Sequence, residues 1–301
     1  MAKNVLLVGL GAVGSLIASR FVDAGLKISA LCDDQRKKKY DQEDFILNGE
    51  KYSFDYVTCD SYGEIADLVI IATKYHSLKD SIKDLNVVID ENTTVLSILN
   101  GIDSEQIVGD VVGIEKMLYG YIYRTDATKV GNVSNFKARE IIAYGEKDGT
   151  ISDRIYMVAD IFKSAGIEYE AETDILRSMW WKYMLNIGLN QVSCVLKATY
   201  GTFKNCEATW AVAESAMKEV AKVANAKGIN LDKASIDRVF EVVGKLDKDG
   251  KTSMFQDVEA KRKTEVEMFA KKLCELGEEF GIDTPVNKML LNQIWTIEYL
   301  Y

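Results

Sequence analysis

Histidine and proline are almost absent from this chain of 301 residues, which has one of each, His76 and Pro285. A single histidine excludes a metal site built from several histidines, and any Ser-His or Cys-His mechanism would have to use His76. If the protein is an enzyme, its proton donor is therefore expected to be another kind of side chain. We expect His76 to lie in a loop or at a helix start, with a ligand contact as the alternative.

Cysteine is scarce, and no two cysteines form a C-x-x-C pair. The five cysteines are Cys32, Cys59, Cys194, Cys206 and Cys274. This scattered, odd-numbered pattern is typical of reduced thiols in a cytoplasmic protein, so we expect packing roles, no disulfide framework and no metal site. The chain also lacks a run of about 18 apolar residues. We therefore expect no membrane span. Because a strand pattern begins by Asn4, we also expect no signal peptide.

Basic residues are in the minority, with 37 lysines and arginines against 46 acidic residues and a net charge of −9. This balance argues against nucleic acid or an anionic membrane as a partner. Apolar residues make up 48% and charged residues 28%, an ordinary composition for a globular protein. At roughly 100–200 residues per domain, the length predicts two domains or one large one.

In the first half of the chain, buried-strand patterns alternate with helical patterns. Strands are expected at residues 5–8, 27–31, 67–72, 93–99 and 167–170, and further strands across 117–145 are expected to extend the same sheet. Helices are expected at residues 12–24, 77–85 and 151–165. This alternation predicts a doubly wound parallel sheet, an α/β fold.

From about residue 172 onward every segment has helical periodicity. Helices are expected at residues 172–197, 207–227, 232–245, 254–280 and 284–300. The expected breaks are Gly201, Gly228, the run 247–250, and Gly281 with Pro285. No linker rich in Pro, Gly or Ser separates the halves, so we predict an α/β domain at residues 1–171 followed directly by an all-α domain at residues 172–301.

A glycine-rich loop follows the first strand and fits G-x-G-x-x-G. Its residues are Gly9, Leu10, Gly11, Ala12, Val13 and Gly14. It opens a helix within a unit of about 30 residues, which is the context that makes this motif informative. Gly9 permits a tight turn, Gly11 lets backbone N–H groups approach a pyrophosphate, and Gly14 allows close packing of helix on strand. The loop predicts a Rossmann-type dinucleotide site.

The end of the second strand normally distinguishes NAD from NADP. Asp33 and Asp34 lie where a carboxylate would bond the ribose hydroxyls and repel a 2′-phosphate, which favours NAD. Arg36 and the lysines at 37–39 follow at once, and they form either a clamp for a 2′-phosphate or a solvated loop. These residues leave the choice of cofactor open.

A polar stripe crosses an apolar helix in the second half. Lys182, Asn186 and Asn190 recur at steps of four, so a regular helix places them on one face. Their neighbours are mostly aromatic or aliphatic, and buried polar groups without partners are costly. A polar ligand in a cleft would satisfy them, and a solvent-exposed strip is the alternative.

A second set of polar residues, Ser253, Asp257, Lys261 and Glu265, also recurs at steps of four. Ser253 is placed to cap a helix or to contact a ligand, and Asp257 suits the first turn of that helix. Spacing alone favours a solvated face with weak ion pairs from Lys261 to Asp257 and Glu265.

Together these residues resemble the ketopantoate reductase (2-dehydropantoate 2-reductase) family along essentially the whole chain. The matching motifs are the loop from Gly9 to Gly14, Lys74 after Ala72-Thr73, Asn100-Gly101, the K-x-x-x-N-x-x-x-N helix from Lys182 to Asn190, and Ser253 to Asp257 followed by Thr264-Glu265. The lysine–asparagine helix combined with the serine–glutamate motif is the most specific of them.

The resemblance implies hydride transfer from NADPH to the ketone carbon of ketopantoate, giving pantoate for coenzyme A synthesis. Lys182 would be the general acid, with Glu265 beside it as a second catalytic residue. The substrate would be held by Asn186, Asn190, Ser253 and Asn100. The cofactor would be bound by the glycine loop together with Asp33, Arg36, Lys74, Asn100 and Glu265. Residues 1–171 would then bind dinucleotide, and 172–301 would bind substrate and support a homodimer.

The chain departs from the family pattern at several positions. Gln191 stands where the family commonly has proline, Tyr200 replaces a common asparagine before Gly201, and Asp33 stands about where a basic residue usually serves NADP. After Thr264-Glu265, the family's Asn-Gly pair is absent and the chain has Phe269-Ala270-Lys271. Two alternatives therefore stay open: a reductase of another 2-keto acid, and a nucleotide-sensing regulator without turnover.

Overall fold

The computed structural model describes residues 3–137 and 139–301, and the chain divides into two compact units that meet between Ile175 and Leu176. The described part of the first unit contains an eight-stranded sheet in the order β12-β11-β8-β7-β6-β1-β2-β5. Its strands are β1 (Val5–Val8), β2 (Ser29–Leu31), β5 (Asp55–Val57), β6 (Leu68–Ile71), β7 (Thr94–Ser97), β8 (Met117–Tyr123), β11 (Ile141–Gly145) and β12 (Glu168–Ala171). All pairs are parallel except β8 with β11.

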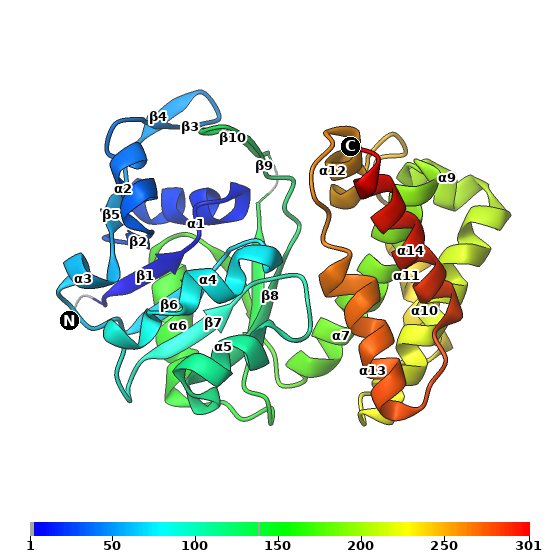
Figure 1. Cartoon of the computed structure of the whole chain (residues 1–301). Helices are drawn as coiled ribbons and strands as arrows, with labels where there is room; N and C mark the ends of the chain where they lie inside the picture. Colours follow the sequence, from blue (N-terminus) through cyan, green and yellow to red (C-terminus); the bar gives the residue numbers. More distant parts are fainter. Residues whose placement is uncertain (1–2, 138) are drawn as a thin grey trace. The chain divides into compact units, whose positions relative to one another are not determined.

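Helices cover both faces of this sheet (Figure 1). The helices of the unit are α1 (Ala12–Asp23), α2 (Asp34–Tyr40), α3 (Cys59–Tyr62), α4 (Leu78–Ile82), α5 (Ser104–Val112) and α6 (Asp153–Ser164). Along β1, Leu7 packs into the apolar cluster with α1 and α6, whereas Leu6 packs into the cluster with α4 and α5. Burial on both faces explains the continuous apolar runs of the central strands. The predicted doubly wound α/β fold is confirmed.

A second, four-stranded sheet of the first unit lies over α1 (Figure 1). Its described strands, in the order β4-β3-β10-β9, are β4 (Glu50–Tyr52), β3 (Phe45–Leu47), β10 (Val133–Asn135) and β9 (Thr128–Val130). The prediction that residues 117–145 extend the main sheet is therefore right for β8 and β11 and wrong for β9 and β10. These two strands form a hairpin, and β10 pairs with β3, which lies far away in the sequence.

The second unit is helical throughout its described elements. Its helices are α7 (Ile175–Asn186), α8 (Val192–Leu196), α9 (Tyr200–Asn205), α10 (Glu207–Ala226), α11 (Lys233–Gly244), α12 (Ser253–Glu259), α13 (Lys272–Phe280) and α14 (Pro285–Tyr299). Its described residues include two π-helical turns. Ile187–Gln191 joins α7 to α8, and Glu267–Lys271 leads directly into α13. The expected helix at 254–280 is wrong, because α12 ends at Glu259 and Lys261 has a positive φ of 51°. Gly201 does not break a helix but lies inside α9.

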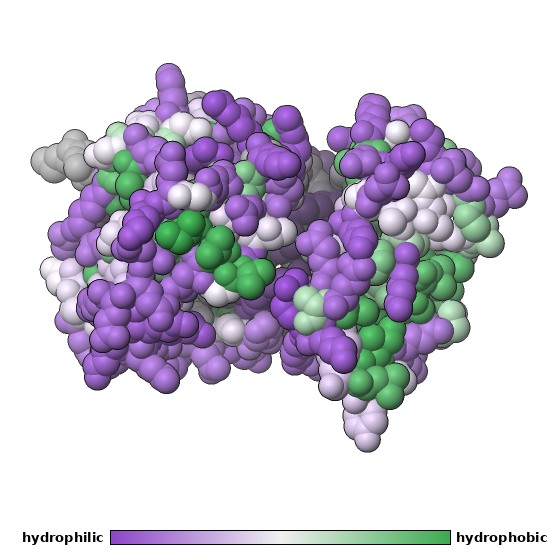
Figure 2. Space-filling view, turned by 90° about the horizontal axis from the view of Figure 1, so that it is seen from above, coloured by the Kyte–Doolittle hydropathy of each residue, from purple (hydrophilic) through white to green (hydrophobic). Residues whose placement is uncertain are grey.

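The surface differs between the units. In the view of Figure 2, apolar side chains gather on the second unit, whereas the first unit shows a mostly hydrophilic surface with a smaller apolar strip. No helix in the described part of the chain is both long and apolar enough to span a membrane. The five cysteines are free thiols.

Candidate active site

The glycine loop begins where β1 ends and leads directly into α1. Gly9 has a φ of 103°, a conformation that favours glycine, so the tight turn requires this residue. Gly11 is the N-cap of α1, with no side chain capping the helix and no acidic residue in its first turn. The backbone N–H groups at this helix start thus keep their affinity for an anion.

Each glycine of the loop meets a different environment. A Cβ atom on Gly14 would overlap the carbonyl oxygen of Gly9, and one on Gly9 would overlap Thr73. At Gly11 the space is open, since an added Cβ would have the Ala72 oxygen at 3.9 Å as its neighbour. Gly9 and Gly14 therefore allow the loop to pack tightly against its neighbours, whereas Gly11 leaves open space beside the backbone. This arrangement fits the pyrophosphate of a dinucleotide.

The residues expected to choose between cofactors lie at the start of α2. Asp33 is the N-cap of this helix: its carboxylate accepts a hydrogen bond from the backbone N–H of Arg36 at 2.7 Å. The Arg36 guanidinium lies 3.6 Å from the same carboxylate, and both side chains are exposed. The lysines at 37–39 are largely exposed, as the alternative of a solvated segment requires, but they lie on this helix and not in a loop. The carboxylate of Asp33 is thus already engaged by its own helix.

Lys74 and Asn100 follow two neighbouring parallel strands, β6 and β7. Because β1 pairs with β6 in parallel, the carboxyl ends of all three strands lie at one edge of the sheet. The glycine loop, Lys74 and Asn100 are therefore brought to the same edge, where open α/β sheets bind ligands. His76 lies on an exposed 3₁₀ turn just beyond Lys74, as expected for a loop histidine.

Lys182 and Glu265 are electrostatically coupled within the second unit. Burial lowers the pKa of Lys182 to about 7, and the negative charge of Glu265 opposes this shift by raising it. Burial therefore has the larger effect, which leaves the amine able to exchange a proton near neutral pH. A lysine with this pKa is suited to general acid–base chemistry.

Hydrogen bonds from neighbouring residues fix this pair in place. The Tyr183 hydroxyl donates to the carbonyl of Phe269 at 2.6 Å, which joins α7 to the π-helical turn after Glu265. Thr264 donates to Glu298 of α14 through its backbone N–H at 2.7 Å and its hydroxyl at 2.6 Å. Tyr183, next to the lysine, is thus bonded to the π-helical turn, and Thr264, next to the glutamate, is bonded to α14. These bonds limit the movement of both charged side chains.

Asn186 and Asn190 are both buried, but a regular helical face does not connect them. Asn186 is the last residue of α7, and Asn190 lies in the π-helical turn that follows. The side-chain nitrogen of Asn186 is buried and has no hydrogen-bond partner among the described residues. An unpartnered buried N–H donor is costly, and π-helical turns are frequent at functional sites. The alternative of a solvent-exposed strip is wrong for these two asparagines.

Gln191, one of the departures from the family pattern, belongs to a buried network in the helical unit. Its side-chain nitrogen donates to Asn287 at 3.0 Å, and Asn287 donates to Glu219 at 2.7 Å. Glu219 also accepts from the backbone N–H groups of Val286 and Asn287 at the start of α14. This glutamine thus links the π-helical turn to α10 and α14, a packing role that proline cannot perform.

The second polar set does not form one helical face. Thr252, not Ser253, is the N-cap of α12, and Ser253 is the exposed first residue of the helix. Asp257 pairs with Arg262 at 2.9 Å in place of Lys261. Ser253 and Lys261 are exposed, but Asp257 and Glu265 are buried, so the expected solvated face is wrong for these two acidic residues. The positive φ of Lys261 turns the chain before it reaches Glu265.

Burial also shifts the pKa values of Glu105 and Lys129 strongly, and no sequence motif marks either residue. Burial raises the pKa of Glu105, in the first turn of α5, to about 8. Burial also lowers the pKa of Lys129, on β9, to about 8. An acidic residue at a helix start and a lysine in a hairpin are common patterns, so neither position carries a signal in the sequence.

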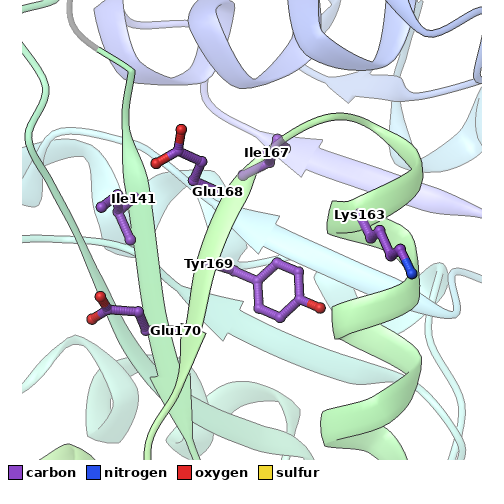
Figure 3. Close-up of a pocket in the computed structure, with 6 residues that line it drawn as sticks. All are labelled: Ile141, Lys163, Ile167, Glu168, Tyr169 and Glu170. Atoms are coloured by element: carbon purple, nitrogen blue, oxygen red, sulfur yellow. The ribbon is translucent and has the colours of Figure 1, made fainter.

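Two cavities of the structure contain none of the predicted site residues. One, of about 430 Å³, lies along the edge strand β12 beside α6 and is lined by Lys163, Glu168, Tyr169 and Glu170 together with Ile141 and Ile167 (Figure 3). The other, of about 480 Å³, is formed by α8, α12 and α14. Neither cavity is lined by the glycine loop, by Lys182 or by Glu265.

The fold and these residues define a class: a Rossmann-type oxidoreductase with a helical C-terminal unit. Two family models match the chain, "Ketopantoate reductase PanE/ApbA" at residues 5–149 and "Ketopantoate reductase PanE/ApbA C terminal" at residues 174–298. The chain therefore belongs to the ketopantoate reductase family.

One relative supports this assignment by sequence, and solved structures share the fold. A 2-dehydropantoate 2-reductase of Archaeoglobus fulgidus is 30% identical over 299 residues, covering 98% of each chain. Among solved structures, D-mandelate dehydrogenase with NADH and anilino(oxo)acetate superimposes with a TM-score of 0.88 at 20% identity, covering 99% of each chain. A dimeric ketopantoate reductase of Staphylococcus aureus superimposes with a TM-score of 0.83 at 18% identity, again covering 99% of each chain. At these identities the structural matches show a shared fold.

Proposed function

We propose that this protein reduces 2-dehydropantoate (ketopantoate) to (R)-pantoate with NADPH, a step of pantothenate and coenzyme A biosynthesis. The observation that carries the proposal is the coupled pair in the helical unit: Lys182, whose pKa burial lowers to about 7, and the buried Glu265. In this proposal residues 1–171 bind the dinucleotide and residues 172–301 bind the substrate. The family match supports the reaction class, and the retained lysine argues against a nucleotide sensor without turnover.

Reduction of a ketone requires a hydride on carbon and a proton on oxygen. When bound, the reduced nicotinamide dinucleotide supplies the hydride. The ammonium of Lys182 polarises the ketone by donating a hydrogen bond to its oxygen, and it releases its proton to that oxygen as the carbonyl π electrons move there. The lysine is left as a neutral amine, which its buried environment tolerates. Glu265 holds part of the amine population protonated near neutral pH, which keeps the acid available.

NADPH is proposed over NADH from the residues around the second strand. Asp33 is already engaged in capping α2 and pairing with Arg36, which weakens its repulsion of a 2′-phosphate. The exposed guanidinium of Arg36 has the geometry to bind that phosphate. Lys74 and Asn100, at the same sheet edge as the glycine loop, are proposed to contact the cofactor. Initial rates with NADPH and with NADH at equal concentration test this choice.

Asn186, Asn190, Ser253 and Asn100 are proposed to hold the substrate. We expect Asn186→Ala to raise the KM for ketopantoate by roughly 10-fold, because it removes the buried side-chain nitrogen that has no hydrogen-bond partner in the described part of the chain. Asn292→Ala, at an exposed position of α14, is the matched control. Steady-state rates of NADPH oxidation measure both. An unchanged KM in Asn186→Ala would remove this residue from the substrate site.

Glu265→Gln tests the electrostatic coupling. The protonated form of Lys182 is the proposed acid, so kcat of the wild type is expected to fall as pH rises through the pKa of about 7. Removing the charge of Glu265 lowers that pKa, so the descending limb moves to lower pH by roughly one unit. Glu267→Gln, two residues away and paired with Lys263 at 3.3 Å, is the control. Profiles of kcat from pH 5 to 9 show the shift, and a limb that stays in place contradicts the coupling.

A reductase of another 2-keto acid is the second candidate. It is favoured by the overall likeness to D-mandelate dehydrogenase, solved with anilino(oxo)acetate, and by Gln191 in place of the family's proline. NADPH oxidation with ketopantoate and with phenylglyoxylate, measured side by side, separates the two. The higher kcat/KM identifies the substrate class.

A further inference from the structure

Lys129 reaches the glycine loop from the hairpin that lies over it. Its amine donates a hydrogen bond to the carbonyl oxygen of Leu10, the second residue of the loop. The same amine lies 4.3 Å from the centroid of the buried Phe45 ring. A lysine carried on the small sheet is thus in direct contact with the segment that follows β1.

No negative charge balances this lysine among the described residues. Both partners, a carbonyl oxygen and an aromatic ring, are neutral, and the nearby charge that acts on the amine is the like charge of Lys39 on α2. Burial first, and Lys39 second, lower its pKa to about 8. A partly buried ammonium is costly unless an anion pairs with it. Because Lys129 contacts the glycine loop, an anion bound at that loop would lie within reach of its amine.

The small sheet is anchored firmly enough to hold the amine in position. The hydroxyls of Ser134 on β10 and Ser15 on α1 lie 3.2 Å apart, and both are fully buried. Arg20 of α1 binds the carboxylate of Glu140 through two hydrogen bonds of 2.8 Å, just beyond the hairpin. Lys129 therefore lies on a sheet that is anchored to α1, and this anchoring holds its amine against the glycine loop.

We propose that Lys129 binds a phosphate group of the dinucleotide and is therefore part of the cofactor site. An ammonium has three N–H donors, and the carbonyl of Leu10 uses one of them. The remaining donors are available to an anion that approaches the open side of Gly11 or the start of α2. This inference rests on the proposed function, because it requires a dinucleotide ligand. The phosphate is either part of the pyrophosphate or the 2′-phosphate of NADPH.

Titration of NADPH and of NADH against the full chain, by nucleotide fluorescence at low and high salt, tests the proposal without turnover. Lys129→Met is expected to weaken NADPH binding by roughly 10- to 100-fold and to reduce its dependence on salt. Lys129→Arg, which keeps the charge, is expected to retain most of the affinity. Lys137→Met removes an exposed lysine just after β10 and is the control for surface charge. Thermal unfolding of each variant reports whether the small sheet remains intact.

The two nucleotides distinguish the phosphates. Equal losses for NADPH and NADH assign Lys129 to the pyrophosphate, and a loss confined to NADPH assigns it to the 2′-phosphate. Lys129→Met that binds both nucleotides like the wild type overturns the inference, as does an equal loss in Lys129→Met and Lys129→Arg. A wild type that binds nucleotide without reducing ketopantoate overturns the proposed function alone. A wild type that binds neither nucleotide overturns both.

Discussion

Lys182→Met is expected to lower kcat for ketopantoate reduction by about 100- to 10,000-fold, the usual contribution of a general acid. Methionine is similar in length and has no proton to give, so the developing alkoxide has no donor in this position. Nucleotide affinity is expected to remain, because the glycine loop lies in the other unit. Single-turnover and steady-state NADPH oxidation, together with nucleotide titration, separate these two effects.

The pH dependence gives this variant a second readout. In the wild type we expect kcat to fall above pH 7, as the acid loses its proton. The residual rate of Lys182→Met is expected to lack this limb. Stability changes in the opposite sense: because the folded pKa of Lys182 lies below its ordinary value of 10.5, the unfolded chain binds more protons between about 7 and 10.5. The wild type therefore gains stability as pH rises through that window, and the variant does not.

Lys222→Met is the matched control, because Lys222 is an exposed lysine on α10 of the same unit. It is expected to retain wild-type kcat and the wild-type pH profile. Full activity in Lys182→Met, with folding verified by its thermal transition, would mean that another group supplies the proton. The single histidine lies on an exposed turn of the first unit, so imidazole offers no alternative within the helical unit.

The doubly wound sheet could be predicted because its central strands are buried on both faces. Strands such as β1 and β6 have uninterrupted apolar sequences, and the helices that cover them have their own periodicity. The small sheet could not be predicted in this way. Its strands have three residues each, and β4 carries Glu50 and Lys51, so no alternation stands out. Its parallel pairing of β3 with β10 joins segments far apart in the sequence.

Helical periodicity predicted only part of the local geometry of the candidate site. Steps of four identified Lys182 and Asn186 on α7, but the same step fails at Asn190 because a π-helical turn begins at Ile187. It fails again between Asp257 and Glu265, where Lys261 adopts a positive φ. Such local departures depend on tertiary packing, including the bond from Tyr183 to Phe269, and hydrophobic periodicity does not encode them.

Glu105 is a buried titratable group that has no role in the proposed reaction. It lies in the first turn of α5, which begins after the loop that contains Asn100. Its side chain is 1% exposed, and neither carboxyl oxygen has a hydrogen-bond partner among the described residues. Burial raises its pKa to about 8, and the neighbouring Asp103 adds to the rise. The folded protein therefore holds this carboxyl group protonated at neutral pH.

The consequence for stability has a definite sign. Between the ordinary pKa of 4.5 and the folded value of about 8, the folded chain binds a proton that the unfolded chain has lost. The free energy of unfolding therefore falls as pH rises through this window and levels off above it. At 1.36 kcal/mol for each pKa unit, the total loss over the whole window is on the order of 5 kcal/mol.

Glu105→Gln is expected to remove this loss, because the amide is neutral at every pH and nearly the same size as the protonated acid. The variant should gain stability over the wild type as pH rises from 5 to 8.5, by up to about 4 kcal/mol, or roughly 10 °C in Tm. Urea and thermal unfolding across this range measure the difference, and Glu91→Gln, at an exposed position, is the control. A stability difference that stays constant with pH would show that Glu105 is ionised in the folded protein. The carboxyl group would then need an unrecognised positive partner beside the loop that carries Asn100.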